Sequence, residues 1–226
     1  AGTSMGSIVG GSYASGMSVQ EMDKAIGTIT SASLFTDRPP PADLPMRRKD
    51  DDANSYIIPE LGVTKDGISL PKGIVTGVSV EAQLRKLVKV NTAPSFDHLP
   101  IVFRAVATDL GTGEMVILKD GSLVTAMRAS MSVPGGMAPV QIGTRQLVDG
   151  GLVRNLPVDL ARSLGAEIVI AVNLGTPLSS REAIQSVLGV TAQMVNILTV
   201  QNVRASLASL KPTDILIEPQ LGGFSA

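Results

Sequence analysis

Periodic runs of apolar residues divide most of the 226-residue chain into predicted helices and strands. Small residues follow one another closely from Gly6 to Ala14, a pattern typical of a helix that packs tightly on a sheet, and Gly16 is placed to end that helix. Ser18 and Glu21 form a capping-box pattern at the start of a second helix. Helices are predicted over residues 6–14, 18–28, 79–90, 123–128 and 181–209.

Short apolar runs bounded by Gly, Pro, Asn and Asp predict the strands. The run at residues 101–110 and the run that begins at residue 114 are separated by a glycine-rich turn, so they are expected to be neighbours in one sheet. Further strands are expected at residues 144–151, 167–174 and 214–219, whereas the first ten residues are too rich in glycine for one. Helices that alternate with apolar strands predict an α/β fold, a three-layer α/β/α domain with a largely parallel central sheet.

Residues 34–71 interrupt this pattern with many Gly, Pro and charged residues and little periodicity. We therefore expect a long irregular region there. Loops of that length are usually functional or mobile. The charge run at residues 47–52 (RRKDDD) fits either a contact with a headgroup or partner domain, or a solvated loop whose charges neutralise each other. The length of the chain predicts one domain over residues 1–226.

Composition excludes several classes of function. The net charge of −1 gives no electrostatic footprint for nucleic acid, so no nucleic-acid partner is expected. The absence of Cys and the single His make a thiolate or histidine metal centre improbable, and neither a metal nor a cofactor is expected. No apolar run approaches the roughly 20 residues of a membrane-spanning helix.

The residues Gly2–Gly6 spell G-x-S-x-G, the pattern of a nucleophilic serine on a sharp strand-to-helix turn. Ser4 would be the nucleophile, and the N–H groups of Met5 and Gly6 at the helix N-terminus would face a developing oxyanion. The same pattern also fits a helix N-terminus that packs closely or holds a phosphate without catalysis. The motif alone leaves both interpretations open.

A serine nucleophile needs a base, which can be a histidine or else a carboxylate, a lysine or an amine. The single histidine, His98, lies in a turn-like setting that is typical of a surface loop. Asp149 ends an apolar strand and is followed by Gly150 and Gly151, so its carboxyl group is placed where α/β sheets build their sites, although Asp-Gly is also an ordinary turn. A carboxylate acts as the base only when it is partly desolvated and close to the hydroxyl.

Several segments together resemble the patatin-like phospholipase family over essentially the whole chain. They are GTSMGS around Ser4, RASMSVPGGMAPV at residues 128–140, and VDGG at residues 148–151, in this order and spacing. The segments RRKDDD, LPKGIVTG, FRAVATDLGTGE and ASLKPTDILIEP are most similar to the secreted bacterial type Vd autotransporter phospholipases.

The resemblance implies a lipid acyl hydrolase of the phospholipase A type, which cleaves carboxylic esters of phospholipids at a membrane surface. Ser4 would accept the acyl group and Asp149 would be the base in both half-reactions, supported by Met5, Gly6, Gly150 and Gly151. Arg128 and Ser130 match the family near the site, where a structural role is as consistent as catalysis. Met131, Val133 and Met137 would line an acyl groove, or else fill the core.

The resemblance also predicts features outside this sequence. A glycine-rich oxyanion loop, with the first strand and helix, would precede Ala1, and a further helix would follow Ala226. A secreted or cell-surface location in a bacterium and tethered transporter domains are expected from the resemblance alone, with a cytoplasmic location as the alternative. A homodimer is neither indicated nor excluded. Two other functions stay open: an α/β-hydrolase esterase that uses His98, and a non-catalytic module that binds lipid or an anion.

Overall fold

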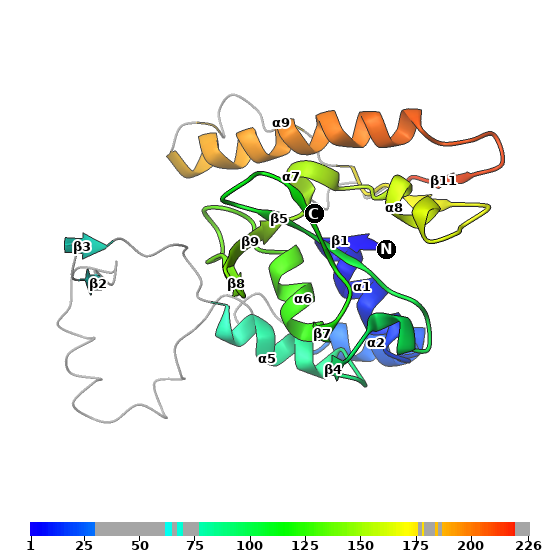
Figure 1. The fold of residues 1–226 in the computed structure, drawn as a ribbon, viewed down its shortest axis with the longest axis horizontal. Helices are drawn as coiled ribbons and strands as arrows, with labels where there is room; N and C mark the ends of the chain where they lie inside the picture. The colour runs from blue at the N-terminus through cyan, green and yellow to red at the C-terminus, as the bar shows by residue number, and fades with distance from the viewer. Residues whose placement is uncertain are drawn as a thin grey trace.

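The computed structural model describes residues 1–29, 62–64, 67–69, 77–175, 178, 184 and 187–219. Helices cover both faces of a central sheet (Figure 1). Helices α1 (Met5–Ala14) and α6 (Leu123–Ser130) lie on one face. On the other face the long helix α9 (Val187–Ala208) passes over the short helix α7 (Gly151–Arg154). The predicted α/β class is therefore confirmed.

The central sheet is mixed rather than largely parallel, so that part of the prediction is wrong. Its strands are β1 (Gly2–Thr3), β5 (Ala105–Asp109), β6 (Met115–Leu118), β8 (Val140–Ile142) and β9 (Arg145–Asp149). Only β1 pairs with β5 in the parallel sense, whereas β5–β6, β5–β9 and β8–β9 are antiparallel. Short turns join β5 to β6 and β8 to β9, and turns of that length connect only antiparallel neighbours. The expectation that the strands around residues 101–118 are neighbours is confirmed.

The first strand also differs from the prediction, because Gly2 and Thr3 do form a strand despite the glycine content around them. They pair with Ala105 and Val106 of β5. A Cβ atom added to Gly2 would lie 2.2 Å from the carbonyl oxygen of Gly6. The glycine is therefore required by the close return of α1 over β1, and it does not weaken the case for a strand at this position.

The predicted helix signals near the N-terminus are confirmed. Helix α2 (Val19–Ile26) begins at Ser18, whose side chain accepts a hydrogen bond from the Glu21 N–H while the Glu21 carboxylate accepts from the Ser18 N–H. Gly16 follows α1 with a left-handed φ of 99°. Helix α5 (Val78–Lys86) is shorter than expected, because the chain leaves the helix at Leu87.

Small residues let α1 lie close to the elements beneath it. A Cβ atom added to Gly10 would be 3.1 Å from the ring of Phe103, and one added to Gly11 would be 3.0 Å from the sulfur of Met127. Phe103 and Met127 belong to the main hydrophobic core, which lies between the sheet and the helices α1, α5 and α6. The core therefore fixes the helix that begins directly after Ser4.

Two short paired strands lie inside the region that we expected to be irregular. Strands β2 (Gly62–Thr64) and β3 (Gly67–Ser69) form an antiparallel pair. The rest of residues 34–71, including the charge run at residues 47–52, lies outside the described residues.

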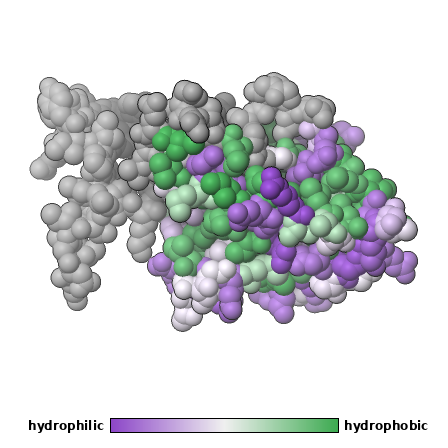
Figure 2. Space-filling model, turned by 90° about the horizontal axis from the view of Figure 1, so that it is seen from above, coloured by the Kyte–Doolittle hydropathy of each residue, from purple (hydrophilic) through white to green (hydrophobic). Residues whose placement is uncertain are grey.

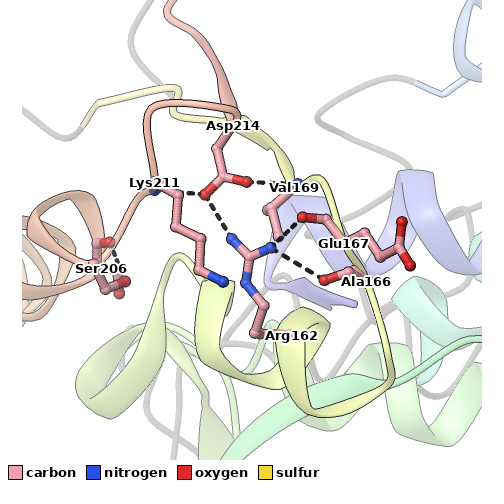
Figure 3. Close-up of polar contacts among 8 residues, drawn as sticks. Arg162, Ala166, Glu167, Val169, Ser206, Lys211 and Asp214 are labelled. Atoms are coloured by element: carbon pink, nitrogen blue, oxygen red, sulfur yellow. Dashed lines mark hydrogen bonds and ion pairs between the residues drawn. The ribbon is translucent and has the colours of Figure 1, made fainter.

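The C-terminal part of the fold is a second small sheet held by a polar clip (Figure 3). Strand β10 (Ile170–Val172) pairs in parallel with β11 (Ile215–Ile217). The guanidinium group of Arg162, on α8 (Val158–Ser163), donates to a carboxylate oxygen of Asp214 at 2.6 Å and to the carbonyl oxygens of Ala166 and Glu167. The clip therefore ties α8 and the turn before β10 to the start of β11.

The β10 strand is shorter and more exposed than predicted. Val169 and Ala171 pack into a second core with α8 and α9, but Ile170 and Val172 on the alternate positions are exposed. Helix α9 likewise presents apolar side chains to the exterior, on the face seen in Figure 2, where hydrophobic patches lie among hydrophilic ones. Within the described residues, no helix combines the length and apolar character needed to cross a membrane.

The remaining elements complete the order of the chain. Strand β4 (Thr92–Ala93) pairs with β7 (Gly121–Ser122), and a 3₁₀ helix spans Phe96–His98.

Candidate active site

Ser4 and Asp149 meet because two strands approach each other head-on along one edge of β5. Thr3, the last residue of β1, pairs with Val106, and Asp149, the last residue of β9, pairs with the next residue, Ala107. Because β1 is parallel to β5 and β9 is antiparallel to it, their C-terminal ends converge on this point. Neither chain can continue along β5 without meeting the other, so both turn out of the sheet there.

The turn at Ser4 is a strained strand-to-helix junction. Ser4 has φ 52° and ψ −120°, and it is the only residue other than glycine with a positive φ among those the structure describes. Such a conformation costs about 1–3 kcal/mol and persists only where the surroundings enforce it. Its carbonyl oxygen accepts hydrogen bonds from the Ser7 N–H at 2.9 Å and the Ser7 hydroxyl at 2.7 Å. The side chain of Ser4 is left partly exposed at the start of α1.

The carboxyl group of Asp149 is buried, with the residue only 4% exposed. One of its oxygens, Oδ1, accepts a hydrogen bond of 2.6 Å from the Gly151 N–H. Its backbone is fixed as well, since its N–H donates to the Ser132 carbonyl at 2.9 Å and its carbonyl accepts from the Thr108 hydroxyl at 2.9 Å. The sheet and the loop after α6 therefore hold the carboxyl group in one position.

Burial raises the pKa of Asp149 from 3.8 to about 6, because the charged form loses its water. Hydrogen bonding to the Ser4 hydroxyl and to the Gly151 N–H acts in the opposite direction. A group with a pKa near 6 is ionised at neutral pH and is a stronger base than an ordinary carboxylate. The environment therefore supplies the partial desolvation that a carboxylate base requires.

Ser130 links the two halves of the site. Its fully buried hydroxyl accepts a 2.9 Å hydrogen bond from the Ser4 N–H and donates one of 2.6 Å to the carbonyl of Val106. Its own carbonyl oxygen accepts from the Gly150 N–H at 3.3 Å. The sequence placed Ser130 near the site, and the structure shows that it holds the strained Ser4 backbone and the turn after Asp149 together.

Arg128, from the same segment, is buried and supports the loop that follows α6. Its guanidinium group donates to the Ser132 hydroxyl and to the carbonyl oxygen of Ala138. The carbonyl oxygen of Ser132 in turn accepts from the Asp149 N–H, so Arg128 supports Asp149 through Ser132. The described contacts of Arg128 are therefore structural ones.

The glycines after Asp149 are required by close packing. A Cβ atom added to Gly150 would lie 2.3 Å from the Val106 carbonyl oxygen, at the point where β1 and β9 converge. One added to Gly151 would lie 2.9 Å from the Asp149 carboxylate. Both glycines thus leave room for the close packing around the carboxyl group.

Met5 and Gly6 are the first two residues of α1 and line the cleft beside Ser4. The first N–H groups of a helix have no acceptor within it, and the helix dipole adds partial positive charge there. These two residues therefore lie where an oxyanion formed next to Ser4 would find donors.

A cleft with a volume of about 510 Å³ borders Ser4. Residues 1–6 with Val9 and Gly10 line one side, and residues 155–158 and 169–175 line the other. Strands β1 and β10 flank the cleft. Among the described residues, each of them pairs with one strand only and so has one free edge. Apolar side chains and free strand edges together suit either an acyl chain or an extended segment.

Other residues singled out in the sequence lie elsewhere. Met137 belongs to the main core, Met131 packs against that core and Val133 is 37% exposed; none of the three lines the cleft beside Ser4. His98 is exposed on its 3₁₀ helix and is not part of the cleft lining either. The described residues also contain no group of three or more His, Cys, Asp or Glu able to hold a metal ion.

Contacts from α9 are the feature that sequence reasoning missed. Thr199 and Asn202 donate hydrogen bonds to the Gly151 carbonyl at 3.1 and 2.7 Å. No local signal could have revealed them, because the partners are about 50 residues apart.

Sequence comparisons relate the chain to known proteins. The sequence model of the family described as "Patatin-like phospholipase" matches residues 1–162. An "Uncharacterized NTE family protein" of Mycobacterium tuberculosis is 41% identical over 80 residues, 35% of this chain and 22% of the relative. A second one from that species is 47% identical over 64 residues, 28% of this chain and 11% of the relative.

"Patatin-like phospholipase domain-containing protein 7" of Mus musculus is 42% identical over 82 residues, which are 35% of this chain and 6% of that protein. The chain thus covers less than a quarter of each of these relatives, which are NTE-family and patatin-domain proteins rather than specifically autotransporters. Because the family match extends over most of the chain and includes both Ser4 and Asp149, the chain belongs to the patatin-like phospholipase family.

Proposed function

We propose that this chain is the catalytic domain of a lipid acyl hydrolase of the phospholipase A type, with Ser4 as the nucleophile and Asp149 as the base. The observation that carries the proposal is the convergence of β1 and β9, which brings a strained, partly exposed serine to a buried carboxylate. The family name supports a phospholipid ester as the substrate. The proposed fold is the three-layer α/β/α domain of this family.

In acylation, the Ser4 hydroxyl oxygen attacks the ester carbonyl carbon while the Asp149 carboxylate takes the hydroxyl proton. The oxyanion of the tetrahedral intermediate lies at the N-terminus of α1, where the N–H groups of Met5 and Gly6 stabilise it. When the bond to the alcohol breaks, the proton on Asp149 passes to the departing oxygen, and the acyl group stays on Ser4.

In deacylation, Asp149 takes a proton from a water molecule, which attacks the acyl carbonyl. The second tetrahedral intermediate collapses, Ser4 regains its proton from Asp149, and the carboxylic acid leaves.

Labelling of the full-length protein with a fluorophosphonate, followed by peptide mapping, tests the nucleophile. We expect the label on Ser4 and release of fatty acid from phosphatidylcholine vesicles by the wild type. Ser4→Ala and Asp149→Asn should each lower that release roughly a thousandfold or more.

Ser12→Ala is the matched control, because Ser12 is a buried serine on the same helix whose hydroxyl has no hydrogen-bond partner within the described part of the chain. It should keep nearly full activity. A label on another residue, or full activity in either Ser4→Ala or Asp149→Asn, would refute the proposal.

We also propose, from the resemblance alone, a secreted or surface location with a tethered transporter domain in the full-length protein. The segments that resemble type Vd autotransporters support this location, whereas the NTE-family relatives give no support for it. Fractionation of the native cells with protease shaving tests it, and a protein found only in the cytoplasmic fraction contradicts it.

A further inference from the structure

Helix α9 is linked to Asp149 through Gly151, whose carbonyl oxygen accepts hydrogen bonds from two side chains of α9. The Asn202 side-chain nitrogen donates to this oxygen at 2.7 Å and the Thr199 hydroxyl donates to it at 3.1 Å. The Asn202 side-chain oxygen also accepts from the Asn155 N–H at 2.8 Å. Three hydrogen bonds from two residues therefore fasten both ends of the short helix α7 to α9.

Gly151 is also the residue whose N–H holds the carboxylate of Asp149, at 2.6 Å. A glycine has the widest backbone freedom of any residue, so the direction of its N–H depends on what restrains it. Here the restraint on the carbonyl side comes from α9, and the restraint on the other side is the Gly150 N–H bond to the Ser130 carbonyl. The orientation of the carboxyl group thus depends on a helix that is far away in the sequence.

We infer that Asn202 and Thr199 are positioning residues for the reaction: they fix Gly151 so that its N–H holds one oxygen of Asp149 and leaves the other for Ser4. The inference rests on the proposed function. Both residues lie beyond residues 1–162, where the family model matches, so that match assigns them no role.

The inference predicts a change in the acidity of Asp149. The Gly151 N–H hydrogen bond lowers the pKa of Asp149 against the effect of burial, so a loosened Gly151 raises that pKa further. Burial and the hydrogen bonds with Ser4 and Gly151 are the causes of the pKa shift at Asp149. Charged residues on the neighbouring elements are the same in the wild type and the variants below. They are Asp109 on β5, Arg128 on α6, Arg145 on β9, Arg154 on α7 and Arg204 on α9.

The test is the pH dependence of fluorophosphonate labelling at Ser4 in the full-length protein. In the double variant Asn202→Ala/Thr199→Val, the acid limb of the labelling rate should move to higher pH. Below pH 6 labelling should be about fivefold slower, the factor expected for one lost hydrogen bond. The difference should narrow above pH 8, where Asp149 is ionised in both proteins.

Two further variants separate positioning from general damage. Ser206→Ala removes a buried hydroxyl group from α9, one turn after Asn202. The Ser206 hydroxyl oxygen has no hydrogen-bond partner among the residues described, so this variant should keep the acid limb of the wild-type labelling profile. Asn202→Ala/Thr199→Ser keeps the hydroxyl donor and should recover part of the shift. Thermal melts followed by circular dichroism show that each variant is folded, and if the double variant is unfolded, Asn202→Ala alone is measured.

A folded variant with the wild-type acid limb overturns the inference while leaving the proposed function intact. A wild-type protein that is not labelled at Ser4 refutes the proposed function itself, and the inference with it.

Discussion

Replacing Asp149 with asparagine should make the folded protein more stable at neutral and alkaline pH while it removes activity. Asparagine has nearly the same shape and keeps an oxygen that can accept from the Gly151 N–H. It carries no charge, so it avoids the cost of burying an ionised carboxylate at 4% exposure. The base that we propose for the reaction is thus a stability cost to the fold.

The magnitude follows from the pKa of Asp149, which burial raises from 3.8 to about 6. Because the folded state holds the proton more tightly than the unfolded state, the free energy of unfolding falls as pH rises through this window. At about 1.4 kcal/mol per pKa unit the full cost above pH 6 is about 3 kcal/mol. For a protein of this size that corresponds to a rise in Tm of roughly 6–12 °C for Asp149→Asn at pH 8.

Thermal or urea unfolding of the wild type and Asp149→Asn at pH 8, 6 and 4 measures the difference. We expect the variant to be more stable at pH 8 and the advantage to disappear near pH 4, where the wild-type carboxyl group is neutral. An Asn variant that is no more stable at pH 8, or an advantage that is independent of pH, would refute the reasoning.

Asp214→Asn is the matched control with the opposite sign. The pKa of Asp214 is lowered to about 2 by hydrogen bonds from the N–H groups of Lys211 and Val169 and from Arg162 (Figure 3). Its contribution to stability is present above pH 4 and is lost as pH falls toward 2. Asp214→Asn should therefore be less stable than the wild type at pH 8, and the difference should shrink in acid.

Three further variants test the arrangement around the site. Ser130→Ala should lower kcat about tenfold with little change in KM, because the strained Ser4 N–H loses its acceptor, and steady-state kinetics on mixed micelles measures this. Gly150→Ala should lower the free energy of unfolding by about 3 kcal/mol in urea titrations, since its Cβ would overlap the Val106 carbonyl; a variant as stable as wild type would contradict the packing. His98→Ala should keep kcat within about twofold in the same kinetics, and a large loss would favour a histidine-based mechanism.

Local sequence signals predicted the local structure well. The capping box of Ser18 and Glu21, the helix stop at Gly16 and the small-residue face of α1 depend on residues a few positions apart. The prediction of a largely parallel central sheet was wrong, because apolar runs indicate burial and not strand direction. The short turns that join β5 to β6 and β8 to β9 were the better signal for antiparallel pairing.

The sequence indicated both candidate residues of the site, but no local pattern in it indicated that they lie close together. Ser4 is marked by its flanking glycines, a pattern that also fits a helix N-terminus without catalysis. Asp149 is marked by a strand end and the glycines after it, a pattern that also occurs as an ordinary turn. Their proximity depends on the register of β1 and β9 along the same edge of β5, which no local pattern encodes.

The sequence by itself determined most of the helices and strands, the small residues that permit close approach and the family resemblance, because these depend on side-chain size, hydrophobicity and short-range hydrogen bonds. Only the tertiary structure decided the mixed sheet, the burial that raises the pKa of Asp149, the bridge through Ser130 and the support from α9. Each of these depends on contacts between residues far apart in the chain, and such contacts exist only after the core has packed.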